Sequence, residues 1–321
     1  MVNWGVLATG HISTKFANGL KEAKDSRLYG VASRTLAKAE AFAEEHGFSR
    51  AFGSYEELAS CPEVDVVYIG TVNTCHHENA MMCLGKGKHV LCEKPFAMSK
   101  THAEEMIGTA RSKGLFIMEA LWNRFQPIAR QVDVWAKSGA IGEVRQLIAE
   151  FGFETVLGEA GRHLNPGLGG GAVVDVGIYP LTYANMLFGM SPTHVSSTAM
   201  VGGTGVDEQS AMLLGYGGGA FAMLSGACTT RTGHDATVYG TLGRIEVKDF
   251  WRATKATLEV YGGDVTTVEI PFRRNGYEYE IEEVNRCVSE GRLESPSYTH
   301  GETLYVTGLM EGMRKSWGMG Y

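Results

Sequence analysis

Two short motifs carry the side chains best suited to moving a proton. The first is Glu93-Lys94-Pro95, and the second is Asp175-Val176-Gly177-Ile178-Tyr179. If the second motif is helical, Asp175 and Tyr179 are four residues apart and share one face. A phenol beside a carboxylate and a lysine is a proton-transfer set for alcohol oxidation, because the ammonium stabilises a phenolate that otherwise forms only near pH ~10.

The sequence leaves the proton carrier open. Either Tyr179 takes or returns the hydroxyl proton with help from Lys94, while Asp175 orients the group, or Lys94 carries the proton and Tyr179 donates a hydrogen bond to the same oxygen. A plainer interpretation also stands for each residue. Lys94 is then an exposed lysine before a proline turn, and Tyr179 an amphipathic residue at the edge of a core.

A glycine-containing turn near the N-terminus is the candidate cofactor loop. A dinucleotide site needs a tight turn and a helix N-terminus aimed at the pyrophosphate, usually written G-x-G-x-x-G. Here Ala8 and Ser13 stand at the first and third glycine positions, and only Gly10 remains. The turn lies between the first predicted strand and helix, so we interpret it as a dinucleotide loop, with an ordinary strand–helix turn as the alternative. Its expected cofactor contacts are Ala8, Thr9, Gly10, His11 and Ile12.

The end of the second predicted strand indicates which dinucleotide is bound. NAD sites usually place an acidic residue there, which binds the ribose 2′-hydroxyl. This chain has Ser33 and Arg34, with Lys38 one turn into the next helix. A guanidinium forms a charge-assisted fork with a 2′-phosphate, which a carboxylate would repel. The pattern predicts NADP over NAD, unless these residues form only a solvated basic turn.

Two further strand ends place polar residues at the same edge, where open α/β sheets bind ligands. Thr71 and Asn73 follow a β-branched run and are expected beside the ribose and the nicotinamide. His76 is included among the cofactor contacts, although capping or packing is its more ordinary role. Glu93 and Lys94 follow the next strand and are expected near the nicotinamide end of the cofactor.

The elements that position these motifs fall into two regions. Over the first 120 residues, short apolar runs alternate with helical patterns, which predicts βαβ units and a doubly wound parallel sheet of the Rossmann type. From about residue 144, strand-length runs separated by glycine-rich turns predict an α+β domain with a large, mostly antiparallel sheet. The boundary is placed within residues 120–125, giving domains of residues 1–121 and 122–321. The expected strands of the second region are 144–154, 195–200, 209–216, 220–227, 236–239, 244–248, 257–260 and 266–270, and its helices are 178–187, 279–289 and 301–315.

Composition excludes several classes of protein. The 321 residues are 44% hydrophobic, which is enough for packed cores. A net charge of −7 without a long basic run argues against nucleic-acid binding, and no apolar run reaches the ~18 residues of a membrane-spanning helix. The six cysteines form no C-x-x-C pair and no zinc-like cluster, so we expect free thiols, no metal and a cytoplasmic protein. The strand-like start leaves no room for a signal peptide.

Taken in order, the motifs resemble one known family. The set A-T-G-H-I, S-R, E-K-P, W-N-R-F and G-G-G-A-x-x-D-x-G-I-Y resembles the glucose–fructose oxidoreductase / inositol dehydrogenase / MocA (Gfo/Idh/MocA) superfamily, over residues 4 to about 296. The run M-E-A-L-W-N-R-F followed by D-V-G-I-Y is most similar to its dimeric dihydrodiol dehydrogenase and NADP-dependent xylose dehydrogenase branch. Many members have histidine where this chain has Tyr179, and this departure favours that branch over the inositol and glucose enzymes.

The resemblance implies a Rossmann domain followed by a domain whose large sheet forms a homodimer contact. It also implies that Lys94 lies beside the substrate hydroxyl, with Asp175 and Tyr179 as the second catalytic pair. Trp122 and Arg124 are then expected to flank the nicotinamide and the substrate. The remaining expected substrate contacts are Phe153, Arg162 and Tyr279.

The expected activity is hydride transfer between NADP and a secondary alcohol or hemiacetal carbon of a sugar or cyclic diol. One alternative is an NADPH-dependent keto-sugar reductase, which runs the same chemistry in the opposite direction. An alternative of another class is an NADP-sensing regulatory protein without catalysis. The retained Lys94, Asp175 and Tyr179 argue against the sensor.

Overall fold

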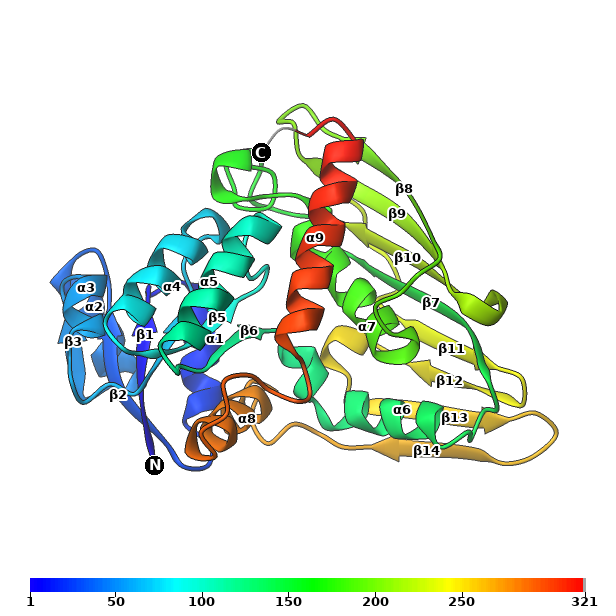
Figure 1. Cartoon of the computed structure of the whole chain (residues 1–321), viewed down its shortest axis with the longest axis horizontal. Helices are drawn as coiled ribbons and strands as arrows, with labels where there is room; N and C mark the ends of the chain where they lie inside the picture. The colour runs from blue at the N-terminus through cyan, green and yellow to red at the C-terminus, as the bar shows by residue number, and fades with distance from the viewer. Residues whose placement is uncertain (320–321) are drawn as a thin grey trace. The chain divides into compact units, whose positions relative to one another are not determined.

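The computed structural model describes residues 1–319 and divides the chain into two compact units (Figure 1). Unit 1 comprises Met1–Trp122 and Phe272–Thr307, and unit 2 comprises Asn123–Pro271 and the chain from Gly308 onward. The structure thus differs from a simple division at residue 121, because segment 272–307 packs with the N-terminal residues. Residues 320 and 321, at the end of the predicted second domain, lie outside the described part of the chain.

Unit 1 is built on a six-stranded parallel sheet with strand order β3-β2-β1-β4-β5-β6. β1 pairs with β2 on one side and with β4 on the other, so the chain reverses its direction of growth there. Such a switch point is where doubly wound sheets bind ligands, at the carboxyl ends of the strands. The predicted parallel sheet is confirmed. The strands are β1 (Val2–Leu7), β2 (Ser26–Ala32), β3 (Arg50–Phe52), β4 (Val66–Ile69), β5 (His89–Glu93) and β6 (Ile117–Ala120).

Helices cover this sheet, which explains why its strands read as apolar runs rather than alternating ones. One core is formed by apolar residues of the strands and of three helices, α3 (Tyr55–Ala59), α4 (His76–Gly85) and α5 (Lys100–Ser112). α1 (His11–Leu20) packs against α8 (Glu278–Ser289), and α2 (Leu36–His46) contacts β2 and β3. The indole N–H of Trp4 donates to Asn285 Oδ1 of α8 (3.0 Å), so a C-terminal helix completes the core around β1.

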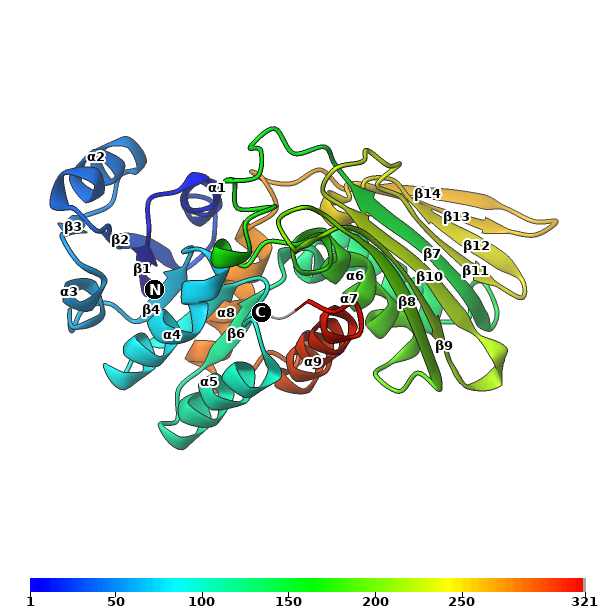
Figure 2. The same ribbon diagram turned by 90° about the horizontal axis from the view of Figure 1, so that it is seen from above.

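Unit 2 is built on an eight-stranded sheet with order β14-β13-β12-β11-β7-β10-β9-β8. Only β7 and β10 pair in parallel among its described strand pairs, and the others are antiparallel, which confirms the predicted sheet type. The helices α6 (Pro127–Lys137) and α7 (Ile178–Phe188) lie on one side of it (Figure 2). Its strands are β7 (Val144–Gly152), β8 (His194–Val201), β9 (Asp207–Gly215), β10 (Phe221–Ala227), β11 (Ala236–Gly240), β12 (Gly243–Val247), β13 (Lys255–Val260) and β14 (Val265–Glu269).

A short π-helix, Val173–Gly177, leads directly into α7. π-Helical turns are rare and are frequent at functional sites. Gly177 packs backbone to backbone on β10, since a Cβ added at Gly226 would lie 3.0 Å from the Gly177 Cα. The glycines therefore allow the π-turn to approach the sheet closely.

α9 (His300–Ser316) begins in unit 1 and continues into unit 2. Among the described helices, none is both long and apolar enough to cross a membrane.

Candidate active site

The β1–α1 turn has the geometry of a dinucleotide loop despite its missing glycines. Ala8 has φ +77°, the left-handed conformation that glycine adopts without strain. Gly10 is the N-cap of α1, and a Cβ added there would meet no heavy atom within 4 Å. The third glycine position holds the buried Ser13. The glycine that allows α1 to approach the sheet closely is instead on the strand side, at Gly70. A Cβ on Gly70, just after β4, would lie 2.7 Å from the Ser13 Oγ.

The end of β2 presents the residues expected to distinguish the two dinucleotides. Ser33 is buried and its hydroxyl lies 3.4 Å from that of Thr9, whereas Arg34 and Lys38 are exposed. Tyr55, at the start of α3, was missed by sequence reasoning. Burial raises the pKa of Tyr55, and the charge of the nearby Arg34 opposes that rise. The Ser33 hydroxyl, the Arg34 guanidinium and the Tyr55 phenol therefore lie close to the carboxyl end of β2.

The residues that follow β4 are tied to the turn that follows β5. The Thr71 hydroxyl accepts a hydrogen bond from Asn79 (3.2 Å), and Asn73 opens a short 3₁₀ turn. His76 is fully buried, with its Nδ1 2.8 Å from the Pro95 carbonyl oxygen and its Nε2 3.2 Å from that of Thr71. Burial lowers the pKa of His76. The ring therefore links two loops, which is the packing role that the sequence also allowed.

Lys94 stands at the carboxyl end of β5 and is half-buried. The carboxylate of the buried Glu93 accepts one hydrogen bond from the Tyr68 hydroxyl (2.6 Å) and another from the Lys94 backbone N–H (3.1 Å). The Tyr68 ring stacks on Phe16 of α1 at 3.6 Å. Glu93 thus orients the backbone of Lys94 from inside the core.

Tyr277, rather than Tyr279, is the aromatic residue that the structure brings to Trp122. The two rings are stacked, with centroids 4.6 Å apart and an interplanar angle of 8°. Tyr279 instead faces Phe272 and lies under the Arg273 guanidinium. Gly276 has φ +96° and lies against the Trp122 indole, where a Cβ would come within 2.7 Å. Gly276, next to Tyr277 in the sequence, is the feature that could have indicated this contact.

In unit 2 the structure gathers four polar or aromatic side chains around Asp175. The buried carboxylate accepts a hydrogen bond from Arg162 (2.9 Å), and His163 Nε2 lies 3.6 Å from its other oxygen. His163 Nδ1 is 2.7 Å from the Thr155 hydroxyl, and the imidazole meets Phe153 edge-on. Arg162, expected at the substrate, therefore makes a contact with Asp175.

Tyr179 lies beside Phe151 and Trp251, which together form an aromatic wall. Its ring centroid is 5.4 Å from that of Phe151 and 6.4 Å from that of Trp251, and the latter two stack at 4.8 Å. His234 meets both from the edge, and its Nε2 is 2.6 Å from the Gly152 carbonyl. Trp251 and His234 were not expected, because they come from a loop after β12 and a loop before β11, far along the chain from Tyr179.

Arg124 is the last of the expected contacts to be placed. Arg124 belongs to unit 2, where its guanidinium donates to the Thr182 carbonyl of α7 (3.3 Å). Within residues 1–319, no group of three or more histidine, cysteine or acidic side chains is arranged to hold a metal ion.

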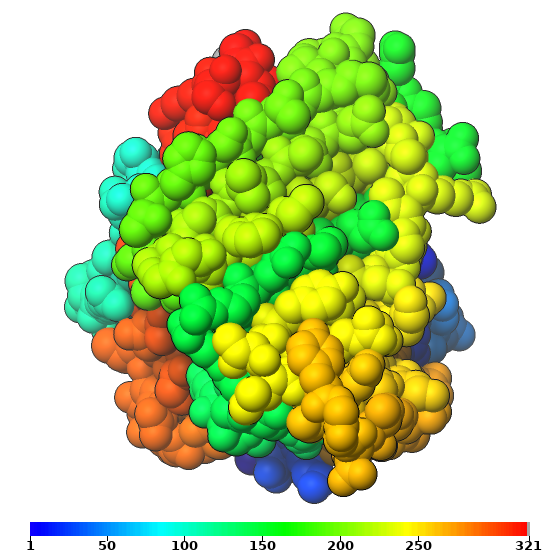
Figure 3. All heavy atoms as spheres, turned by 90° about the vertical axis from the view of Figure 1, so that its right-hand side faces the viewer, coloured from blue at the N-terminus to red at the C-terminus, as the bar shows by residue number. Residues whose placement is uncertain are grey.

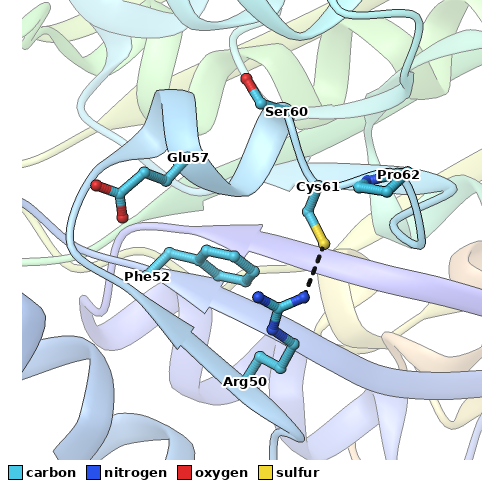
Figure 4. A pocket seen from close by; sticks show the side chains of 6 residues that line it. All are labelled: Arg50, Phe52, Glu57, Ser60, Cys61 and Pro62. Atoms are coloured by element: carbon cyan, nitrogen blue, oxygen red, sulfur yellow. Dashed lines mark hydrogen bonds between the residues drawn. The ribbon is translucent and has the colours of Figure 1, made fainter.

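A separate pocket in unit 1 is lined by residues of β3, of α3 and of the segment that follows α3 (Figure 4). There the Arg50 guanidinium points at the Cys61 thiol, with an N–S distance of 3.4 Å. None of the predicted site residues lines it. The lining residues are Arg50, Phe52, Glu57, Ser60, Cys61 and Pro62.

Comparison with known proteins decides the family. Residues 2–121 match the "Oxidoreductase family, NAD-binding Rossmann fold", and residues 129–246 match the "GFO/IDH/MocA C-terminal domain". The trans-1,2-dihydrobenzene-1,2-diol dehydrogenase of Xenopus tropicalis is 35% identical over 330 residues, covering 99% of this chain and 98% of that protein. The chain belongs to the Gfo/Idh/MocA oxidoreductase family.

Three other known proteins are similar to this chain over nearly its whole length. The Homo sapiens trans-1,2-dihydrobenzene-1,2-diol dehydrogenase is 33% identical, covering 99% of this chain and 97% of its own. Two solved structures share the fold at 24% identity. They are the aldose–aldose oxidoreductase of Caulobacter crescentus complexed with glycerol (TM-score 0.89, covering 100% and 98% of the two chains) and the 3-ketoreductase KijD10 of Actinomadura kijaniata in complex with NADP and TDP-benzene (TM-score 0.86, covering 98% and 97%). The resemblance inferred from the motifs is confirmed.

Proposed function

We propose that this chain is an NADP-dependent dehydrogenase acting on a secondary alcohol or hemiacetal carbon of a cyclic diol or sugar. The observation that carries the substrate class is the aromatic wall of Phe151 and Trp251 beside the Tyr179 ring. Flat rings of this kind bury the face of a small cyclic substrate, while the Tyr179 hydroxyl and the Asp175 carboxylate address its polar edge. The names of the relatives, trans-dihydrodiol dehydrogenases at about one-third identity, support a cyclic diol.

The residues of unit 1 fit a dinucleotide. Ala8 in the left-handed conformation turns the chain sharply, and Gly10 leaves open space before the N-terminus of α1. A helix N-terminus with free space in front of it favours a pyrophosphate. A dinucleotide held there would supply or accept the hydride through its nicotinamide. Arg34, with Ser33 and Lys38 beside it, is proposed to bind a 2′-phosphate, and the strand ends at Thr71, Asn73 and Trp122 to hold the ribose and nicotinamide.

The chain's own side chains then handle the proton. Tyr179 takes or returns the proton of the substrate hydroxyl, and the Lys94 ammonium stabilises the charge that develops on that oxygen. Asp175, held by Arg162 and His163, orients the hydroxyl. This assignment requires Lys94 and Tyr179 to act on one oxygen.

Cofactor titration followed by a substrate panel tests the proposal. Intrinsic fluorescence should show much tighter binding of NADPH than of NADH, and Arg34→Ala should remove most of that preference while Lys113→Ala, an exposed control in the same unit, leaves it unchanged. Equal binding of both dinucleotides would overturn the NADP assignment but not the dehydrogenase. With NADP⁺ present, trans-1,2-dihydrobenzene-1,2-diol, D-xylose and related polyols are then screened for reduction of the cofactor. Binding without turnover of any polyol or ketose would favour the regulatory alternative.

We also propose that the chain forms a homodimer through the open face of its eight-stranded sheet (Figure 3). Ile148, Met223 and Leu213 are side by side in register across β7, β10 and β9, and each is about two-fifths exposed or more. A contiguous exposed apolar stripe of this kind is typical of an interaction surface. The regular face of a sheet suits a second copy of itself, because a two-fold axis brings the same stripe to both sides.

A further inference from the structure

Buried side chains from β5, β6 and α4 bond the backbone of the turn that carries Lys94. The Lys94 N–H donates to Glu93, and the Pro95 carbonyl oxygen lies 2.8 Å from His76 Nδ1. The Phe96 N–H donates to the Glu119 carboxylate (2.8 Å), and the Cys92 thiol donates to the Phe96 carbonyl (3.7 Å). Backbone groups of a buried turn need partners, so these side chains determine where the turn lies.

Glu119 is the member of this set that reaches beyond the turn. It lies on β6, is 1% exposed, and binds the Phe96 N–H through one oxygen. Its second oxygen accepts the Tyr298 hydroxyl (2.9 Å), and Thr303 donates to the same carboxylate. All these residues belong to unit 1. Glu119 therefore joins the Lys94 turn to the C-terminal segment that packs beneath it.

We propose that Glu119 is a positioning residue for Lys94, fixing the Lys94–Pro95–Phe96 turn through its bond to the Phe96 N–H. This inference rests on the proposed function, in which Lys94 acts on the substrate oxygen. A carboxylate suits the position because its two oxygens serve donors on opposite sides, and a charge-assisted bond to an N–H is about twice as strong as a neutral one. A shift of the turn by about 1 Å would misplace the ammonium and cost roughly 10²-fold in rate.

The charge of Glu119 makes this bond sensitive to pH. Burial raises the pKa of Glu119 to about 7, a rise that the bonds from Phe96, Tyr298 and Thr303 oppose and the charge of Glu93 adds to. Further titratable groups on the packed elements include the Cys92 thiol and His89 of β5 and, on α9, Glu302 and His300, whose Nε2 is 2.9 Å from the Ile117 carbonyl. As pH falls through about 7, the bond to the Phe96 N–H loses its charge and the turn loosens.

The test compares Glu119→Met and Glu119→Gln with Glu283→Gln in the full chain. Methionine removes the acceptor at similar volume, whereas glutamine keeps a neutral acceptor for the Phe96 N–H. Glu283 is the matched control, a buried carboxylate of unit 1 that accepts hydrogen bonds from Ser295, Arg286 and Cys287, all in the C-terminal segment. Thermal melts establish that each variant is folded.

Two readouts do not depend on turnover. The first is hydrogen exchange of the Phe96 amide between pH 6 and 8, corrected for the intrinsic rate. The second is the NMR signal of ¹³C-methylated Lys94, identified by its absence in Lys94→Arg. We expect exchange to rise at least tenfold in Glu119→Met, less in Glu119→Gln, and the Lys94 signal to shift in both. The wild type should show a titration of protection near pH 7, which Glu119→Gln lacks, and Glu283→Gln should resemble the wild type.

Measurements of activity then test the positioning role of Glu119 together with the proposed dehydrogenase function. kcat should fall at least tenfold in Glu119→Met with NADPH affinity unchanged, and Glu119→Gln should recover part of it. An unchanged Phe96 exchange rate or an unchanged Lys94 signal in folded Glu119→Met would overturn the positioning role. If the wild type turns over no substrate while both structural readouts change as expected, the proposed dehydrogenase fails and the positioning of Lys94 by Glu119 stands.

Discussion

At the scale of single residues, Tyr179 is positioned by aromatic packing of its ring, whereas Asp175 is positioned by contacts of its carboxylate with cationic or polar side chains. The Tyr179 ring packs on Phe151 and Trp251, so the hydroxyl can be removed without disturbing the wall. Asp175 instead depends on Arg162 and His163 for its electrostatic partners. The two residues therefore call for different substitutions.

Tyr179→Phe is the sharper test of the proton carrier. The aromatic packing persists, so the free energy of unfolding should change by about 1 kcal/mol or less, while kcat falls by roughly 10²-fold or more and NADPH affinity is unchanged. Steady-state kinetics and a fluorescence titration measure both quantities. Loss of cofactor binding with intact turnover would contradict the assignment. A kcat that scarcely changes would indicate that Lys94, rather than Tyr179, carries the proton.

Ala8 offers a second test at this scale, because it holds a conformation that suits glycine better. At φ +77° an L-residue costs about 1–2 kcal/mol relative to glycine, part of which is offset by the greater freedom of glycine in the unfolded chain. Ala8→Gly should therefore raise the free energy of unfolding by roughly 0.5–1 kcal/mol and keep NADPH binding. Ala8→Val, with a β-branched side chain at the same φ, should be destabilised. Denaturant unfolding of the three proteins checks the order, and a destabilised Ala8→Gly would show that the positive φ is not a source of strain.

At the scale of elements, the N-terminus of the π-helix is fixed by Asp207 from β9. Its carboxylate accepts the Val173 N–H (2.6 Å) and the Ala172 N–H, and burial raises its pKa to about 7 in spite of these bonds and the charge of Arg314. The folded pKa lies above the ordinary value, so the contribution of Asp207 to stability is full below about pH 4 and is lost as pH rises through about 7.

Asp207→Asn should remove that pH dependence. Relative to the wild type, the variant should gain on the order of 2 kcal/mol in stability between pH 5.5 and 8.5, because the wild type must bury a charge at the higher pH. Urea unfolding at the two pH values gives the difference. A constant offset between wild type and variant would show that Asp207 does not titrate in this range.

How far the elements follow from the sequence depends on how strong their local pattern is. The run around β4 and the eight strands of unit 2 were predictable, because β-branched runs and glycine turns repeat there. β3 and α3 were missed because three and five residues show no clear period. α6 was missed although Pro127 at its start and the buried Ile128, Val132 and Trp135 give a helical stripe.

The candidate site divides in the same way. Lys94, Asp175 and Tyr179 stand in recognisable motifs, so their place at strand and helix ends could be predicted. The partners of these residues could not, because Trp251 reaches Tyr179 and Tyr298 reaches Glu119 only through the tertiary fold. The π-turn before α7 was also beyond prediction, since no local pattern separates it from an α-helical turn. The return of residues 272–307 to unit 1 depends on contacts such as Trp4 with Asn285, which lie 281 positions apart.

At the scale of the whole molecule, the apolar stripe on the eight-stranded sheet is the feature left to explain. On the three central strands β7, β9 and β10, inward residues such as Leu147, Met212 and Leu224 are buried. Met223 is nevertheless 47% exposed, between Ile148 and Leu213 in register. A stable dimer buries about 800 Å² on each partner, and a face of several strands can supply this area. A monomer would leave the stripe in water at a cost of about 25 cal/mol per Å².

Met223→Asp should therefore convert the dimer to a monomer. Two buried carboxylates would meet near the two-fold axis or be desolvated beside it, which opposes association by several kcal/mol. Light scattering coupled to size-exclusion chromatography gives the mass of each species. Val156→Asp is the matched control, since Val156 is 91% exposed and lies in the loop after β7 rather than on a strand of the stripe, and it should remain dimeric. A wild type that is monomeric at micromolar concentration would overturn the dimer. A Met223→Asp variant that is still dimeric would show that the interface lies elsewhere, because an interface centred on the stripe would bury the introduced carboxylate.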